Sequence, residues 1–264
     1  MVSSAHPIAS KIGLDILKNG GNAFDAAIAV HFALSVVYPN AGNIGGGGFL
    51  VYRLNNGDIG TLDFREKAPE KSYRDMYIDN IEGELKVDDK RSKFGHLASG
   101  VPGSVDGMVK IYDKFSTVDW IDLLEPSIKV AREGFGVTEK QAKGLNNVKK
   151  SLVSANDHPI PFVKEDQWKV GDILTQKNLA NTLEEIKKSK RDGFYKGAVA
   201  ELIINEMKSG GGIISQSDLD NYSSVWREPV IGYFKNHKII SMGPPSSLSL
   251  IHICRCRRLW LCRS

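Results

Sequence analysis

Residues 22–64 read NAFDAAIAVHFALSVVYPNAGNIGGGGFLVYRLNNGDIGTLDF and decide the fold class of this chain. Asn22 is suited to cap a helix, and Asp25 favours the positive end of the same helix. The run that follows is apolar on nearly every side, so we expect a buried helix that ends before Pro39. Glycines then lead into a strand over 49–52, and an Asn-Gly turn predicts a hairpin that returns over 59–64.

The glycines at 45–48 stand between a predicted helix and a predicted strand. Phosphate-binding loops have the opposite order, because they follow a strand and open a helix whose N-terminus holds the anion. The order therefore argues against a phosphate loop. Two interpretations remain: a tight crossing of backbone segments, or main chain that comes close to a ligand.

The elements on either side extend this pattern. Pro7 begins a helix with apolar positions at helical spacing, and Gly20-Gly21 stops it. Beyond the first hairpin, polar residues 66–100 indicate a solvated loop. Helices are expected over 104–115, 120–133, 139–152, 179–189 and 198–208, a loop with a packed Trp168 over 153–174, a short capped turn over 217–222, and a second hairpin from 229–234 and 238–242. This order is typical of a layered α+β domain and not of a βαβ array.

Composition narrows the function classes. The 264 residues are 41% hydrophobic and 25% charged, which is ordinary for a soluble globular protein. The net charge of +4 comes from four arginines in the last eleven residues, which also hold all three cysteines. The remainder is neutral, so we expect no binding to nucleic acid. Its longest apolar stretch, 26–37, is too short to span a membrane.

Histidines offer no metal site by their spacing. They are dispersed, and the sequence contains no CxxC and no HExxH, so we expect neither a metal nor another cofactor. His31, inside the buried helix, is expected to be a packed, hydrogen-bonded core residue and not a ligand. A GxSxG nucleophile elbow is also absent from the sequence.

Several longer motifs carry a resemblance to a known family. The opening HPIASKIGLDILKNGGNAFDAAIAVHFALSVVYPNAGNIGGGGFLVY, followed in order by TLDFREKAP, GHLASGVPGSVDG, GDILTQKNLANTLEEI, DGFYKGAVAELI and MGPPSS, closely resembles the large subunit of the γ-glutamyltransferases, also called γ-glutamyltranspeptidases. The resemblance implies an N-terminal nucleophile hydrolase with an αββα sandwich. The implied precursor cleaves itself ahead of a threonine, which becomes the first residue of a small subunit and attacks γ-glutamyl amides such as glutathione.

The resemblance covers residues 1–247, and the sequence departs from the family pattern at Leu248. Residues 248–264 resemble a translated sequencing adapter, so we expect a non-native tail. We therefore expect a fragment without its nucleophile, with no catalytic residue of its own and no activity alone. Two alternatives stay open: a non-catalytic orphan fragment, or part of a related glutaryl-type acylase. No export signal is visible, although the family suggests a periplasmic or extracellular protein.

Arg65, in DFREKAP, is the one functional residue that the resemblance places. The matching arginine in the family grips the α-carboxylate of the substrate. A planar guanidinium suits this role, because it binds a carboxylate with two parallel hydrogen bonds. The alternative is an ordinary ion pair with Asp63, which lies on the same face of the predicted strand.

Overall fold

The N-terminal helices form as their capping residues predict. A computed structural model describes residues 1–246 except 82–83, 89 and 157. Helix α1 spans Pro7–Lys18 and α2 spans Ala23–Val37. The Asn22 side chain accepts the N–H groups of Phe24 and Asp25, and the Asp25 carboxylate accepts the N–H of Asn22. This reciprocal capping box fixes the start of α2 directly after the Gly20-Gly21 stop.

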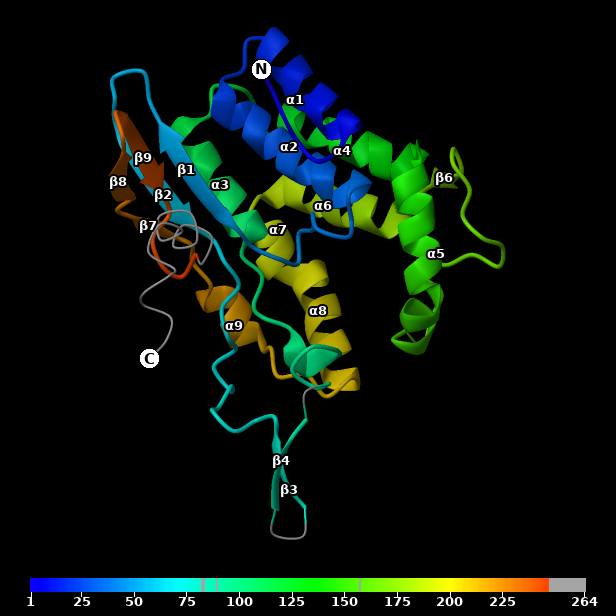
Figure 1. Cartoon of the computed structure of the whole chain (residues 1–264). Helices are drawn as coiled ribbons and strands as arrows, with labels where there is room; N and C mark the ends of the chain where they lie inside the picture. Colours follow the sequence, from blue (N-terminus) through cyan, green and yellow to red (C-terminus); the bar gives the residue numbers. More distant parts are fainter. Residues whose placement is uncertain (82–83, 89, 157, 247–264) are drawn as a thin grey trace.

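A layer of helices surrounds α2 (Figure 1). Helix α2 packs against α1 on one side and against α4, Trp120–Glu133, on the other, and α6, Lys177–Ser189, packs on α4. The apolar run of α2 is buried as expected, with Ile28, Phe32 and Val36 fully inaccessible. The further helices are α3 Ser104–Phe115, α5 Glu139–Ser154, α7 Asp192–Tyr195, α8 Gly197–Ser209 and α9 Gln216–Asn221.

An antiparallel sheet lies against this helical layer. Its strands are β1 Phe49–Arg53, β2 Ile59–Asp63 and β7 Val225–Arg227, in the order β1-β2-β7. Leu62 in the central strand is fully buried. Aromatic rings from both layers pack at the interface. The rings of Phe24 and Phe115 stack with their centroids 4.1 Å apart, and Tyr52 makes T-shaped contacts with Phe115 and Trp226. The first predicted hairpin is therefore confirmed, as two strands of a larger sheet.

The region 66–100 is irregular and polar in large part, but it contains a hairpin that the sequence analysis missed. Strands β3 Ile78–Ile81 and β4 Glu84–Val87 pair antiparallel and project away from the body (Figure 1). A 3-10 turn over His96–Ala98 follows. All of β4 is exposed. Glu84 to Val87 do alternate polar and apolar residues, but the run is only four residues long and lies in a charged stretch, so the sequence indicated a solvated loop there.

Short elements near the middle of the chain were also missed. Strands β5 Phe135–Gly136 and β6 Ile173–Leu174 pair with each other, so the expected loop over 153–174 ends in a strand. Elements of two or three residues, such as these and β7, are too short to show a hydrophobic period. The expected end of the helix over 120–133 is confirmed, since Gly134 adopts φ +89° directly after α4.

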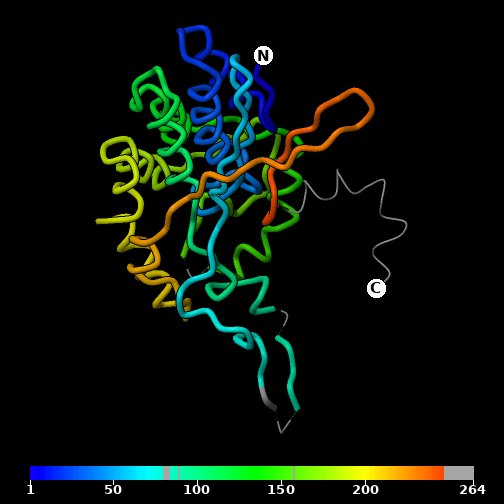
Figure 2. Tube along the Cα trace, turned by 90° about the vertical axis from the view of Figure 1, so that its left-hand side faces the viewer, coloured from blue at the N-terminus to red at the C-terminus, as the bar shows by residue number. Residues whose placement is uncertain are grey.

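The second predicted hairpin is confirmed as β8 Val230–Phe234 and β9 His237–Ser241. It forms its own two-stranded sheet and extends away from the body (Figure 2). Tyr233 and Phe234 are exposed on it. The predicted tail, 248–264, lies outside the described residues. Within the described part of the chain, no helix is both long and apolar enough to cross a membrane.

Candidate functional site

Arg65 lies where the central strand meets the glycine segment. Phe64 extends the pairing of β2 by one residue: its N–H donates to the Gly48 carbonyl at 3.0 Å, and its carbonyl accepts the Gly48 N–H at 3.3 Å. The phenyl ring of Phe64 is buried, whereas Arg65 is exposed. The strand therefore anchors the residue before Arg65 in the core and releases Arg65 at the surface.

Glycines make this junction compact. A Cβ atom on Gly47 would lie 2.4 Å from the Phe64 carbonyl oxygen, and one on Gly103 would lie 2.1 Å from the same oxygen. The Gly46 carbonyl accepts the N–H groups of Gly103 and Ser104 at 2.8 and 3.0 Å. Side chains at these positions have no space, so the structure supports the interpretation of a tight backbone crossing for residues 46–48.

Among the described residues, the Arg65 guanidinium makes one hydrogen bond, from Nη1 to the Pro245 carbonyl at 3.0 Å. In the described part of the chain, no carboxylate lies within 4.0 Å of this guanidinium. The alternative of an Arg65–Asp63 ion pair is therefore not what the structure shows. Asp63 instead accepts the backbone N–H of Arg65 at 3.1 Å and the Nε–H of Arg227 at 2.8 Å.

The backbone of Arg65 is held on its other side by a tyrosine. The Tyr222 hydroxyl donates to the Arg65 carbonyl at 2.8 Å. The ring of Tyr222 stacks on Tyr195, with centroids 5.8 Å apart and planes 7° from parallel. Burial raises the pKa of both tyrosine hydroxyls well above the ordinary value of 10.0, so each stays protonated and able to donate. Arg65 is thus fixed at its N–H, its carbonyl and its guanidinium.

A buried polar cluster contacts the backbone of Tyr222. Asp106 in the first turn of α3 accepts hydrogen bonds from Arg191 Nε at 2.9 Å and from the backbone N–H and hydroxyl of Ser224. Arg191 Nη2 donates to the carbonyl of Tyr222 at 2.7 Å. No sequence pattern predicted this cluster. An acid in the first turn of a helix is so common that its local pattern gives no sign of a distant partner.

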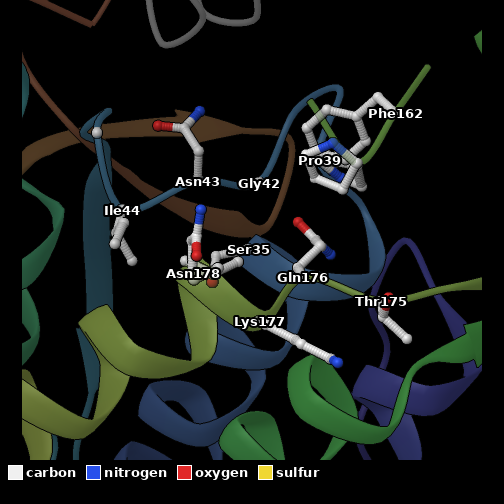
Figure 3. Close-up of a pocket in the computed structure, with 13 residues that line it drawn as sticks. Ser35, Pro39, Gly42, Asn43, Ile44, Phe162, Thr175, Gln176, Lys177 and Asn178 are labelled. Atoms are coloured by element: carbon white, nitrogen blue, oxygen red, sulfur yellow. The ribbon is translucent and has the colours of Figure 1, made fainter. Parts of the chain in front are cut away.

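A cavity of about 530 Å³ lies beside the first part of the glycine segment. Figure 3 shows Ser35, Gln176 and Asn178 facing the same space as the backbone of residues 42–44. The remaining lining comes from Pro39, Gly45, the loop at 161–162, Thr175 and the first turn of α6. Ser35 donates to the Phe32 carbonyl and Gln176 Nε2 donates to the Val36 carbonyl, both at 2.7 Å. These hydrogen bonds hold the cavity wall, and Arg65 does not belong to it.

His31 is half-buried against the rings of Phe32 and Phe64, so the predicted core packing is confirmed in part. Burial lowers the pKa of His31 from 6.5 to about 4, so the imidazole is neutral at physiological pH. Its Nε2 atom is buried without a hydrogen-bond partner in the described part of the chain. The prediction that this side chain is hydrogen-bonded is therefore wrong for Nε2. Across residues 1–246 outside the gaps, no three His, Cys, Asp or Glu side chains gather as a metal site would require.

Comparisons with known proteins agree on one family. A family model described as gamma-glutamyltranspeptidase matches residues 9–254. The glutathione hydrolase proenzyme of Escherichia coli (strain K12) is 43% identical over 249 residues, which cover 94% of this chain and 42% of that protein. The crystal structure of Helicobacter pylori gamma-glutamyltranspeptidase has a TM-score of 0.92 at 45% identity, over 96% of this chain and 72% of the solved chain.

A more distant structure shares the architecture. The cephalosporin acylase from Bacillus halodurans has a TM-score of 0.80 at 25% identity, over 92% of this chain and 46% of the solved chain. The present chain thus spans less than half of the curated Escherichia coli relative and of this acylase.

Fold and site together define an α+β hydrolase fold of the N-terminal nucleophile class, in which the described residues supply a helical layer and a three-stranded sheet. Within that class, the chain belongs to the gamma-glutamyltranspeptidase family. The resemblance drawn from the sequence motifs and the expected fold class are therefore confirmed. The family match ends at residue 254, inside the segment expected to be non-native.

Proposed function

We propose that this chain is the large-subunit part of an enzyme that transfers or hydrolyses the γ-glutamyl group of glutathione and related amides. The observation that carries the proposal is the Arg65 guanidinium, which is exposed, fixed at the end of β2 and unpaired with any described carboxylate. Such a group suits the α-carboxylate of a γ-glutamyl substrate, which it can bind with two parallel hydrogen bonds. Family membership supports the same role.

The proposed reaction needs a second subunit from the same precursor. Its N-terminal threonine attacks the γ-carbonyl carbon through Oγ, while the α-amino group of that threonine accepts the hydroxyl proton. The amide C–N bond breaks, the amine leaves with a proton, and a γ-glutamyl-threonine ester remains. Water or an amino acid then attacks this ester and releases glutamate or a new γ-glutamyl compound. In this scheme, Arg65 orients the acyl group and touches no reacting bond.

A glutaryl-type acylase is the second candidate, since the cephalosporin acylase shares the fold. A glutaryl group and a γ-glutamyl group carry a carboxylate at the same distance from the scissile amide. Arg65 fits both, and the substrates differ in the α-ammonium group. Parallel assays with γ-glutamyl and glutaryl anilides distinguish the two functions, and we expect the γ-glutamyl compound to be preferred.

The test of Arg65 uses the complete two-subunit enzyme that contains this chain. We expect Arg65→Ala to raise the KM for γ-glutamyl-p-nitroanilide by tens to thousands of fold, since losing a charged partner costs about 2–5 kcal/mol. Arg65→Lys should fall between Arg65→Ala and wild type in kcat/KM. Self-cleavage, followed by gel, should proceed in both variants because no substrate carboxylate takes part in it. A wild-type KM in Arg65→Ala refutes the assignment.

We also propose a periplasmic or extracellular location for the complete protein. The family suggests this location, and the absence of cysteine before residue 254 is compatible with an oxidising compartment. Activity confined to the cytoplasmic fraction after cell fractionation contradicts this proposal.

A further inference from the structure

The pairing of charges around Arg65 is unequal. Two arginines lie near a single carboxylate, Asp63, but Arg227 holds it and the Arg65 guanidinium does not. The Asp63 side chain is 9% exposed and that of Arg227 is 44% exposed. A carboxylate buried to this extent needs a cationic partner, because desolvation otherwise penalises its charge heavily.

Strand pairing explains why Arg227 supplies that partner. Strand β7 runs antiparallel to β2, with Asp63 opposite Val225 and Thr61 opposite Arg227. The hydroxyl of Thr61 donates to the Arg227 carbonyl at 2.7 Å, which fixes the backbone from which the Arg227 side chain reaches Asp63. The ion pair is therefore built into the register of the two strands.

Without Arg227, Asp63 would have another cation within reach. Arg65 follows Asp63 by two residues, and alternate residues of an extended chain lie on the same face. The Asp63 Oδ1 atom already accepts the Arg65 N–H, so the carboxylate lies beside the backbone from which the guanidinium extends. An Arg65–Asp63 pair would then compete directly with a carboxylate ligand for the same guanidinium.

We infer that Arg227 is a positioning residue for substrate capture: by pairing with Asp63, it keeps the Arg65 guanidinium free for the carboxylate of the substrate. This inference rests on the role of Arg65 in the proposed function. It assigns Arg227 no contact with the substrate. Its effect is indirect: it decides whether the Arg65 guanidinium is already paired with Asp63 when the substrate carboxylate binds.

The test is a double-mutant experiment in the complete two-subunit enzyme with γ-glutamyl-p-nitroanilide. We expect Arg227→Gln to raise KM about ten- to 150-fold, the range expected when one charge-assisted hydrogen bond is diverted, and to change kcat by less than about twofold. Arg227→Lys keeps a cation near Asp63, so its KM should remain closer to wild type. Arg132→Gln removes another exposed arginine that is paired with a carboxylate, Glu184, and serves as the matched control with unchanged KM.

Rescue separates competition from simple loss of structure. Asp63→Asn, added to Arg227→Gln, removes the competing charge but keeps an oxygen that can accept the Arg65 N–H. We expect this double variant to recover KM to within about threefold of wild type. If Arg227 merely fastens β7 to β2, the double variant will bind substrate as poorly as Arg227→Gln or worse, and the inference fails.

The same series distinguishes this inference from the proposed function. A raised KM in Arg65→Ala together with an unchanged KM in Arg227→Gln overturns the role of Arg227 alone. An unchanged KM in Arg65→Ala overturns the assignment of Arg65 and, with it, the role of Arg227. Should Arg227→Gln fail to fold, Arg227→Met, which keeps an unbranched apolar stem without the cation, and its combination with Asp63→Asn carry the test. Equal KM values in both variants and in wild type contradict competition for Arg65.

Discussion

Removing the Asp106 carboxylate should strongly destabilise the protein. Asp106 is almost inaccessible, with 4% of its side chain exposed, and it receives hydrogen bonds from α7, through Arg191, and from Ser224 before β7. Replacing Asp106 with alanine leaves the Arg191 guanidinium, whose side chain is only 24% exposed, with the exposed and more distant carboxylate of Asp192, at 4.0 Å. Breaking a buried ion pair from one side costs about 3–5 kcal/mol.

Remaining contacts place the cost near the lower end of that range. Arg191 Nη2 also donates to the carbonyls of Leu219, Asp220 and Tyr222, and these bonds survive the substitution. We therefore expect Asp106→Ala to lower the free energy of unfolding by about 3 kcal/mol, and the thermal midpoint by roughly 6–12 °C. Asp106→Asn should lose about 1–3 kcal/mol, because its amide NH2 group replaces an accepting oxygen and must face donors.

Urea unfolding followed by circular dichroism measures this loss. Asp15→Ala is the matched control: Asp15 forms an exposed pair with Lys11 in α1 and should change the free energy of unfolding by less than about 0.5 kcal/mol. If Asp106→Ala lies within 1 kcal/mol of wild type, roughly the precision of such extrapolations, the buried cluster does not support the structure as argued.

Two further predictions concern the core and the backbone crossing. Burial lowers the pKa of His31 to about 4, so as the pH falls below 6.5 this imidazole is protonated in the unfolded chain before it is protonated in the folded one. The free energy of unfolding should therefore fall by up to about 3 kcal/mol between pH 6.5 and 4. His31→Leu should flatten this pH dependence. Gly103→Ala should lower the free energy of unfolding by at least about 3 kcal/mol, since its Cβ would lie 2.1 Å from both the Phe64 carbonyl oxygen and the Tyr222 hydroxyl. Gly144→Ala, inside α5, is the control: its Cβ would have no neighbour within 4 Å, so this variant should be neutral or more stable by up to about 1 kcal/mol. Chemical denaturation at matched pH checks both, and equal losses for the two glycines contradict the crossing.

Local chemistry explains why much of the fold could be predicted. The boundaries of α2 follow from Asn22, Asp25 and Pro39, all of which act within one or two turns of the helix. The first hairpin likewise follows from its own turn residues and strand composition. Elements of three or four residues, such as β3, β4 and β7, carry too little local signal.

The surroundings of Arg65 could not be predicted because they are distant in the sequence. Tyr222 is 157 residues from Arg65, and Arg227 is 164 residues from Asp63. A resemblance to family motifs identified the arginine itself. Its partners became visible when the chain folded back to place β7 beside β2. This is why the ion pair between Asp63 and Arg65 was a reasonable alternative from sequence and why the structure replaced it with Arg227.

The contact between Arg65 and the substrate carboxylate is tested most directly by changing the arginine and the carboxylate in one experiment. In the complete two-subunit enzyme, kcat/KM is measured for a γ-glutamyl anilide and for its α-carboxamide analogue, in wild type and in Arg65→Ala. We expect wild type to prefer the free carboxylate by roughly a hundredfold or more, and Arg65→Ala to lose nearly all of this preference. The same preference in both proteins would show that another group reads the carboxylate.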